Sequence, residues 1–355
     1  MIKQFFSLFI GLSILGSSPL MASVDLEINP HSFVIDLQKI DINGYPDAFN
    51  PSIVRWNDSL LMSFRQVIEP STIPSASESI VGLVWLDDNF NPISDPFILN
   101  FGMQSSRIDD VRLTRIGDTV HIVYSANIDD HITEGGYRMW SAKLEFDGTQ
   151  FFIHDKHRLA YFDGEIPEKR EKNWTPFDYC GFLHFVYSIT PHLVFLPLAG
   201  TECCYTVGKT HADLHWMWGE LRGGTPALKV DNRYLTFFHS SILLSSIHSE
   251  GQMIPHYFIG AYTFADKPPF EITHISRKPI IAKGFYSGAT YDHYWQPVCV
   301  VFPAGMLIED DTIWLTFGRQ DHEIWVAKID KPSLLDSLHP VTPSHPFRAN
   351  GDLVE

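Results

Sequence analysis

Short runs of alternating hydrophobic and polar residues, separated by tight turns, cover most of this chain. One such stretch runs from Val111 to Ser125 and reads V-R-L-T-R-I-G-D-T-V-H-I-V-Y-S. A period of two residues is typical of β-strands, and the Gly-Asp pair at its centre marks a hairpin turn. No stretch shows the sustained 3.6-residue period of a long amphipathic helix. The pattern therefore predicts an all-β protein.

The same hairpin unit recurs five times along the chain. Its copies end at Arg65, Ser125, Ser188, His239 and Gly318. Between the copies lie further strand-like runs, at residues 79–87, 138–146, 256–264 and 323–330, which fit the third strand of a repeated sheet. Self-similarity at this spacing indicates the blades of a propeller rather than a β-sandwich, whose single strands follow one another more closely. We predict a five-bladed β-propeller formed by one domain, residues 24–355.

Alignment of the five copies places a distinctive set of residues just before each first strand. They are Asn50, Asp110, Asn173, Gly224 and either Phe302 or Pro303. The innermost strand of each propeller blade lines a central channel, so these positions should converge at one end of it. The ends of the second strands, among them Arg65 and His239, should lie near the same funnel. We therefore predict a site in which Asp110 meets Asn50 and Asn173.

The motif around Asp110 reads R-I-D-D-V-R, from Arg107 to Arg112. Taken alone, two carboxylates between two arginines are consistent with an exposed ion-pair patch of small energetic value. In a funnel, the same residues are suited to proton transfer and to holding an anionic or polyhydroxylated ligand. The predicted position favours the second interpretation, with Arg107 and Asp109 as ligand-binding residues beside Asp110.

The N-terminus has the layout of a secretory signal peptide. Lys3 precedes an apolar stretch from Phe5 to Leu15, and small residues follow up to Ser23. The apolar stretch is shorter than the roughly 20 residues that a membrane-spanning helix needs. We expect cleavage after Ala22 or Ser23, export to the periplasm or the medium, and no membrane span in the mature chain.

Charge and cysteine content exclude several classes of protein. The chain carries 26 Lys and Arg against 42 Asp and Glu, a net charge of −16, which disfavours nucleic-acid binding. The four cysteines show no zinc-ligand spacing, and the His211, Asp213 and His215 cluster is interpreted as a polar loop rather than a metal site. Nucleotide-binding and serine-hydrolase motifs are also absent from the sequence. We predict neither a metal nor a cofactor, and the sequence leaves the oligomeric state open.

Several motifs together resemble those of glycoside hydrolase family 130. They are R-I-D-D-V-R at Arg107, E-K-N-W-T-P-F at Glu171, R-G-G-T-P-A at Arg222, F-F-H-S at Phe237 and Y-F-I-G-A-Y at Tyr257. The family consists of five-bladed propellers that cleave β-mannosides with inversion, by phosphorolysis or by hydrolysis. The resemblance covers most of the chain after the signal peptide. This chain has Asp109 and Val111 where the family's E-D-P-R motif has Glu and Pro, which marks a divergent member.

The resemblance assigns roles to individual residues. It implies that Asp110 is the general acid and that Asn50 and Arg65 bind the sugar. Lys172 and His239, and more loosely Arg138, match positions that hold phosphate in the family's phosphorylases. Asn173, in the motif at Glu171, shares the register of Asp110. Tyr291 and Asp292, outside these motifs, lie in a polar loop before the last blade, and we include all three as substrate-binding candidates.

Four functions remain open from the sequence. The cationic candidates slightly favour phosphorolysis, with inorganic phosphate as co-substrate, over hydrolysis, for which Glu171, Glu220 and Asp109 are possible second carboxylates. Export favours hydrolysis, because a sugar phosphate made outside the cytoplasm is not directly usable there. The altered acidic motif is also consistent with an exported glycan-binding propeller without activity. A mannosyltransferase related to the phosphorylases is the fourth possibility, and in every case the partner is a glycan.

Overall fold

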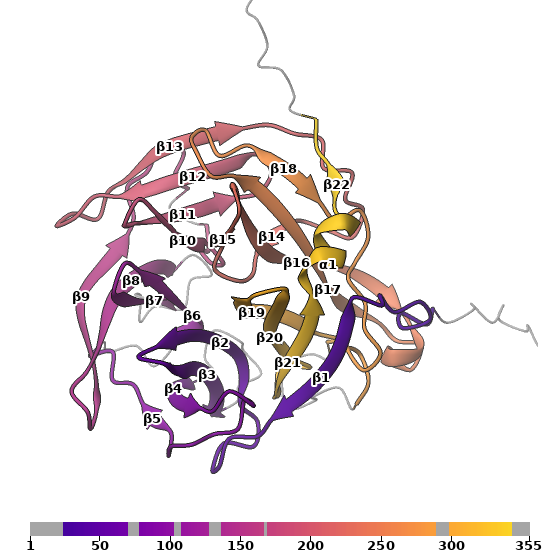
Figure 1. The fold of residues 1–355 in the computed structure, drawn as a ribbon, viewed down its shortest axis with the longest axis horizontal. Coiled ribbons are helices and arrows are strands. Elements are labelled where there is room, and N and C mark those ends of the chain that lie inside the picture. The colour runs from indigo at the N-terminus through magenta and orange to yellow at the C-terminus, as the bar shows by residue number, and fades with distance from the viewer. Residues whose placement is uncertain are drawn as a thin grey trace, which may run out of the picture.

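The computed structural model describes residues 24–69, 78–102, 108–127, 136–166, 169–288 and 298–342. Five antiparallel sheets are arranged around a central axis, as Figure 1 shows. This arrangement confirms the predicted five-bladed β-propeller. No helix in the described part of the chain has the length and apolar character needed to cross a membrane.

The first three blades each contain four strands in chain order. Blade one contains β2 (Phe49–Trp56), β3 (Ser59–Glu69), β4 (Glu78–Leu86) and β5 (Phe97–Ile98). Blade two contains β6 (Ile108–Ile116), β7 (Thr119–Asn127), β8 (Tyr137–Phe146) and β9 (Phe151–Leu159). Blade three contains β10 (Thr175–Tyr179), β11 (Phe182–Ser188), β12 (His192–Pro197) and β13 (Cys204–Thr210). The predicted hairpins and third strands therefore occupy their expected places.

The last two blades depart from this simple order. Blade four contains β14 (Arg222–Gly223), β15 (Leu228–Val230), β16 (Arg233–Ser245), β17 (Met253–Ala265), β18 (Ile272–Ile275) and β22 (His339–Pro340). Blade five contains β19 (Val301–Glu309), β20 (Thr312–Arg319), β21 (Glu323–Asp330) and the N-terminal strand β1 (Val34–Ile40). The helix α1 (Lys331–Ser337) connects β21 to β22. Pairing of β1 with β21 thus closes the ring, whereas the segment after Lys331 covers blade four.

The first strands of three blades begin with an unusual backbone conformation. Asn50, Asp110 and Asn173 have φ values of 49°, 51° and 62°, in the left-handed region that Asn and Asp tolerate better than most residues. The β2–β3 and β6–β7 ladders also shift register at these points. A bulge of this kind redirects a side chain at the end of a strand. The shared register predicted from the sequence is therefore a shared backbone geometry.

Aromatic and aliphatic side chains fill the space between neighbouring blades. Phe177 of blade three and Phe264 of blade four, for example, pack at a ring distance of 5.3 Å, and both are fully buried. Close packing of this kind holds interior side chains in defined rotamers. The blades therefore form a rigid support for the polar residues at the channel.

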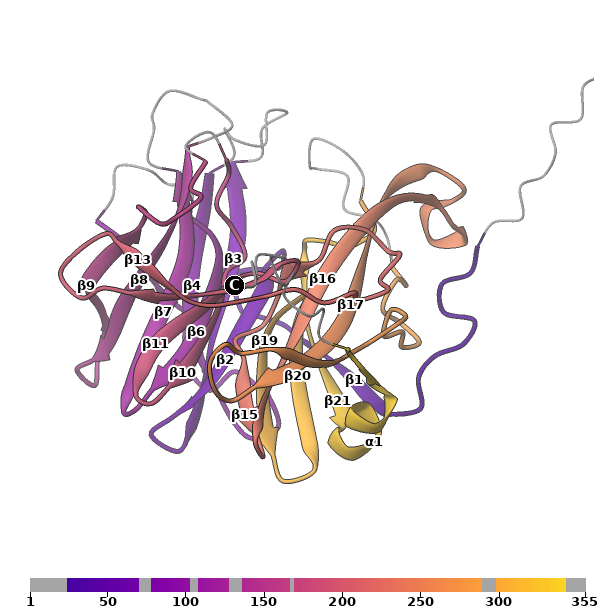
Figure 2. The ribbon, with the colours of Figure 1, turned by 90° about the horizontal axis from the view of Figure 1, so that it is seen from above.

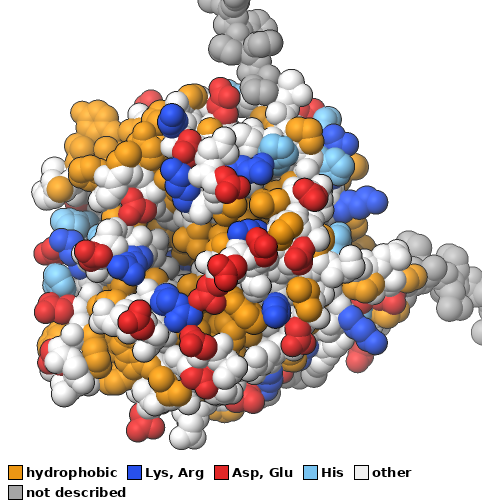
Figure 3. Space-filling model, viewed as in Figure 1, with side chains coloured by type: hydrophobic (Ala, Val, Ile, Leu, Met, Phe, Trp, Pro, Cys, Tyr) orange, Lys and Arg blue, Asp and Glu red, His pale blue; other side chains and the backbone are white. Residues whose placement is uncertain are grey.

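The hairpin turns and the candidate site residues lie at opposite ends of the blades. The β2–β3 and β6–β7 turns, at Asn57–Asp58 and Gly117–Asp118, lie at one end, and Asn50 and Asp110 lie at the other. Figure 2 shows the blades from the side, with the hairpin of β16 and β17 leaning outward from them. On the face seen in Figure 3, acidic and basic side chains are interspersed.

Candidate active site

Asp110 lies at the centre of the converging strand ends. Its Oδ1 accepts a hydrogen bond of 2.9 Å from Asn50 Nδ2, and Arg65 Nη1 lies 3.8 Å from the same oxygen. Its side chain is 12% exposed, so it is largely but not completely shielded from water. Asn50 Oδ1 is buried and has no hydrogen-bond partner among the described residues. The predicted meeting of Asp110, Asn50 and Arg65 is therefore present in the structure.

The adjacent Asp109 has a different environment. It is almost fully buried, with Arg65 Nη2 2.6 Å from its Oδ1 and Lys172 Nζ bonded to its Oδ2. Burial raises the pKa of the Asp109 carboxyl, but the nearby charges of Arg65, Lys172 and Arg170 outweigh burial and hold that pKa well below its usual range. Asp109 is therefore a permanent anion that orders cations from two other segments of the chain.

Arg112 links three blades beneath the carboxylates. Its guanidinium donates hydrogen bonds to the carbonyl oxygens of Gly224, at 2.7 Å, and Asp110, and to Asn173 Oδ1 at 3.2 Å. A Cβ on Gly223 would lie 2.1 Å from Asn173 O, so glycine is required for this close approach of blades three and four. Arg112 and Asn173 thus have a positioning role in the structure, holding the backbone of Asp110 in place.

Two site residues that we did not predict surround Lys172. The Arg170 guanidinium and the Lys172 ammonium both lie 4.3 Å from the centroid of the Tyr137 ring. Burial and the Asp109 charge raise the pKa of Tyr137 to about 12, so its hydroxyl stays protonated. Arg170 lies in the irregular segment before β10, where no periodic pattern identifies it; its place two residues before Lys172 was the available signal.

Asp321 is a third carboxyl group at the funnel that sequence analysis missed. It lies in the turn between β20 and β21, beyond the aligned end of the fifth hairpin at Gly318. Burial is the main reason that its pKa rises to about 6; Arg65 opposes this rise, and the Asp110 and Asp109 charges add to it. Asp321 therefore lies close enough to these three groups to interact with them electrostatically and titrates nearer to neutral pH than an ordinary aspartate.

The other predicted phosphate ligands are embedded in the structure. The ring of His239 stacks on Tyr257 at 5.9 Å, and burial, together with the Arg112 and Arg222 charges, lowers the His239 pKa to about 3. His239 is therefore neutral at physiological pH. Arg138 Nη1 donates to the carbonyl oxygens of Tyr137, at 2.9 Å, and Lys169, at 3.1 Å. Both roles in phosphate binding remain predictions.

The structure describes only part of the predicted set. Arg107, Tyr291 and Asp292 lie outside the described residues. The described residues contain no group of three or more His, Cys, Asp or Glu side chains arranged to hold a metal ion. The Asp213–His215 pair, which we interpreted as part of a polar loop, is exposed, with 3.4 Å between the two side chains.

Two of the alternative second carboxylates are already engaged elsewhere. Glu171 is buried and accepts hydrogen bonds from Trp174 Nε1, at 3.0 Å, and from the Tyr187 hydroxyl. Glu220 is exposed and pairs with Arg222 at 2.8 Å. Asp321 is therefore the carboxyl group, among the described residues, that best complements Asp110.

Known proteins share part of this sequence and most of this fold. No protein-family profile matches the chain. A segment of 86 residues, 23% of the chain, is 31% identical to β-mannosyltransferase 3 of Candida albicans but spans only 16% of that protein. A β-1,2-mannobiose phosphorylase of Listeria innocua, solved with β-1,2-mannobiose, superposes with a TM-score of 0.54 and 16% identity, over 85% of this chain and 92% of the other.

Two further structures span the same blades. A family 130 glycoside hydrolase that targets β-1,2-mannosidic linkages in Candida mannan gives a TM-score of 0.56 at 13% identity, over 81% of this chain and 85% of the other. The GDP-Man-dependent mannosyltransferase MPT-1 of Leishmania mexicana gives 0.55 at 14% identity, over 91% and 94%. This chain has the fold of the family 130 propellers. At these identities the likeness concerns the fold, and the reaction has to be inferred from the site.

Proposed function

We propose that this protein is a mannoside-active enzyme that transfers a mannosyl group between a sugar hydroxyl and a phosphate oxygen. Asp110 is the acid in the direction of phosphorolysis and the base in the direction of synthesis. The fold supports this proposal, since structures with the same architecture include mannoside phosphorylases and a mannosyltransferase.

The observation that carries the proposal is the cluster of cations around Asp109. Arg65, Lys172 and Arg170 all act on this carboxylate, and Arg65 also lies 3.8 Å from Asp110. Three cations beside a sugar-binding carboxylate favour an anionic ligand. A phosphate bound there would make hydrogen bonds to Lys172 and Arg170 while remaining close to the carboxyl of Asp110.

The proposed reaction needs one nucleophile, the phosphate, and one acid, Asp110. A phosphate oxygen attacks the anomeric carbon of the mannosyl group, and the bond from that carbon to the glycosidic oxygen breaks. The proton of the Asp110 carboxyl passes to the departing sugar oxygen. Inversion of a β-mannoside yields α-mannose 1-phosphate and a shortened glycan. In the reverse direction, ionised Asp110 removes the proton from the acceptor hydroxyl.

Neutral His239 fits this scheme as a hydrogen-bonding partner rather than as a charge. A neutral imidazole can donate to or accept from a phosphate oxygen or a sugar hydroxyl, depending on its tautomer. The positive charge required for phosphate would then come from Lys172 and Arg170, with Arg138 a further candidate.

Hydrolysis is the second candidate, and Asp321 is the observation that favours it. A carboxyl group with a pKa of about 6 is largely ionised at pH 7 and can accept a proton from an attacking water. In a phosphate-dependent enzyme the same residue would instead bind sugar hydroxyls.

The first experiment separates these reactions. Purified protein is incubated with β-mannobioses, with and without inorganic phosphate, and both mannose 1-phosphate and free mannose are assayed. Phosphate-dependent mannose 1-phosphate is expected, whereas phosphate-independent free mannose would move the proposal to hydrolysis. Synthesis from a GDP-mannose donor alone would identify a transferase. Binding without turnover in all assays, unaffected by Asp110→Asn, would overturn catalysis.

A further inference from the structure

The hairpin formed by β16 and β17 extends past the level of the candidate site and leans outward from the propeller. Each strand has 13 residues, and β16 continues for six residues after His239, which lies at the level of the site. At about 3.3 Å per residue, the hairpin reaches roughly 20 Å beyond that level. It projects from the blades in Figure 2. The hairpin therefore presents its tip on the side of the molecule toward which the funnel opens.

Three large apolar side chains are exposed near the tip of the hairpin, beside the exposed polar residues Glu250 and Gln252. Leu243 is 66% exposed, Ile247 50% and Met253 61%. Leu243 pairs with Pro255, and Ser245 pairs with Met253, so these four residues share one face of the two strands. Ile254 and His256 on the opposite face are buried. Exposed apolar side chains gathered in this way mark a surface that contacts another apolar phase.

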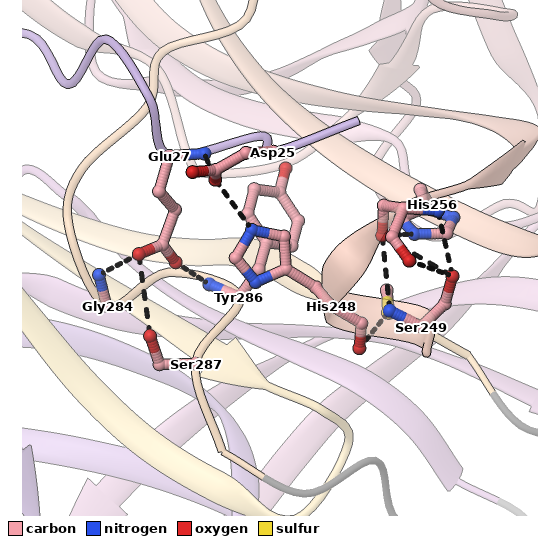
Figure 4. A network of polar contacts seen from close by, with 10 residues as sticks. Asp25, Glu27, His248, Ser249, His256, Gly284, Tyr286 and Ser287 are labelled. Atoms are coloured by element: carbon pink, nitrogen blue, oxygen red, sulfur yellow. Dashed lines mark hydrogen bonds and ion pairs between the residues drawn. The ribbon is translucent and has the colours of Figure 1, made fainter. Parts of the chain in front are cut away.

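The first described residues, from Val24 onward, are hydrogen-bonded to this tip. Val24, 45% exposed, pairs with Ser246, and its carbonyl oxygen accepts a hydrogen bond of 3.0 Å from the Ile247 amide. Asp25 Oδ1 lies 3.2 Å from His248 Nε2, and the two side chains point toward each other in Figure 4. Val24 thus adds a fourth exposed apolar side chain to the patch, which we call the tip patch: Val24, Leu243, Ile247 and Met253.

A second carboxylate prevents the N-terminal segment from swinging away. Glu27 accepts hydrogen bonds from the backbone amides of Gly284, at 2.8 Å, and Tyr286, at 2.6 Å, as Figure 4 shows. The segment is therefore tied at both Asp25 and Glu27, and residue 24 has a fixed position beside the hairpin.

The sequence before Val24 contains the apolar stretch that we expect to enter a membrane during export. The apolar stretch Phe5–Leu15 ends nine residues before Val24. Nine residues span at most about 30 Å even when fully extended. While that stretch is in a membrane during export, the tip patch cannot be farther than this from the same membrane.

The charges at the tip indicate which lipids it contacts. Between Leu243 and Pro255 the sequence contains no Lys or Arg, and Glu250 and Asp25 contribute negative charge. A surface without cations, on a chain of net charge −16, gains nothing from anionic headgroups. We infer that the tip patch docks on a lipid surface with zwitterionic headgroups and holds the funnel facing that surface. This inference does not depend on which mannosyl reaction the site performs.

The test uses the chain from Ser23 onward, because Phe5–Leu15 would itself bind lipid and this form keeps every described residue. Vesicles of phosphatidylcholine are floated with three proteins: the unsubstituted chain, a Leu243→Ser/Ile247→Ser/Met253→Ser variant, and an Ile35→Ser/Ile93→Ser/Ile166→Ser variant. The control removes three isoleucines that are 57%, 59% and 54% exposed elsewhere on the propeller. We expect the tip variant to lose about tenfold or more of its partitioning and the control to keep it.

Several outcomes would overturn the inference. It fails if the unsubstituted chain does not float with the vesicles, if both variants lose binding equally, or if anionic vesicles are strongly preferred. It also fails if the tip variant instead dissociates a dimer in analytical ultracentrifugation, since the tip patch would then cover a second copy of the chain. An unchanged thermal midpoint and near-ultraviolet circular dichroism spectrum establish that the tip variant is folded, so that its loss of binding supports the inference.

Discussion

The two ends of the same blades carry similar charges with different consequences. At the turn end of blades one and five, Arg55 Nε donates to Glu309 Oε1 at 3.0 Å, and the two side chains are 36% and 42% exposed. At the funnel end, Arg65 and Lys172 hold Asp109, which is 5% exposed. An exposed pair gains little, because water screens it and two long side chains lose freedom. A buried cluster cannot lose one partner without leaving a charge that water does not reach.

The contribution of an ion pair to stability therefore depends on its burial, and the number of ion pairs alone does not measure it. The ion pair at the turn end is exposed to water, whereas the cluster at the funnel end is buried.

Replacing Asp110 should have the largest effect. Asp110→Asn keeps the size of the side chain but removes the transferable proton, so we expect turnover of any responsive mannoside to fall by about 10²–10⁴-fold. Steady-state kinetics measure the loss, with Asp88→Asn at the exposed turn end as the matched control. Unchanged turnover in Asp110→Asn would remove this residue from the mechanism.

Removing one partner of Asp109 should lower stability in addition to weakening phosphate binding. Lys172→Met takes away one of its cations while Arg65 stays 2.6 Å away, so we expect a loss of about 1.5–3 kcal/mol in the free energy of unfolding. Because the folded pKa of Asp109 is lowered, its contribution is present above the unfolded pKa of about 3.9 and is lost as the pH falls through the folded pKa. Denaturant titrations at several pH values measure both effects. Arg115→Met, at the exposed Asp118 pair, should cost far less.

Asp321 should show the opposite dependence on pH. Its folded pKa of about 6 lies above the unfolded value of about 3.9, so its ionisation destabilises the fold as the pH rises between these values. Asp321→Asn should therefore stabilise the protein by up to about 3 kcal/mol at pH 8 and have little effect at pH 4. A stability gain that is the same at both pH values would show that ionisation of Asp321 is not its cause.

The smallest effect is expected at the turn end. Glu309→Gln breaks the pair with Arg55, yet Asp88 stays 3.1 Å from the same guanidinium. We expect a change below about 1 kcal/mol, which shrinks further in high salt. Thermal melts at low and high ionic strength measure it. A larger loss would mean that the two ends of the blades are not as different as their exposure indicates.

The alignment of the repeated hairpins predicted the fold and the centre of the site. Repeated hairpins placed Asn50, Asp110 and Asn173 at equivalent positions, and the structure gives all three the same backbone conformation. Such positions are predictable because blade symmetry converts sequence spacing into spatial equivalence.

Site residues outside the repeated hairpins could not be predicted in this way. Asp321 lies in a turn and Arg170 in an irregular segment, where neither periodicity nor alignment marks a position. The different environments of Asp109 and Asp110 also could not be predicted from the sequence. The ion-pair partners of Asp109 are Arg65, from blade one, and Lys172, from the segment that leads into blade three. Such convergence of distant segments is decided by tertiary packing, which local patterns do not encode.

The pairing of β1 with β21 has a consequence for the order of events during synthesis. Residues 34–40 are among the first of the propeller to emerge, yet their partners, residues 324–329, are among the last. The ring therefore stays open until nearly the whole chain has been delivered, and contacts between such remote segments form slowly. A chain arrested before Glu323 would have most of its blades but lack the pairing of β1 with β21 that closes the ring. The funnel, which draws on residues from both sides of that seam, should become competent in a single late step.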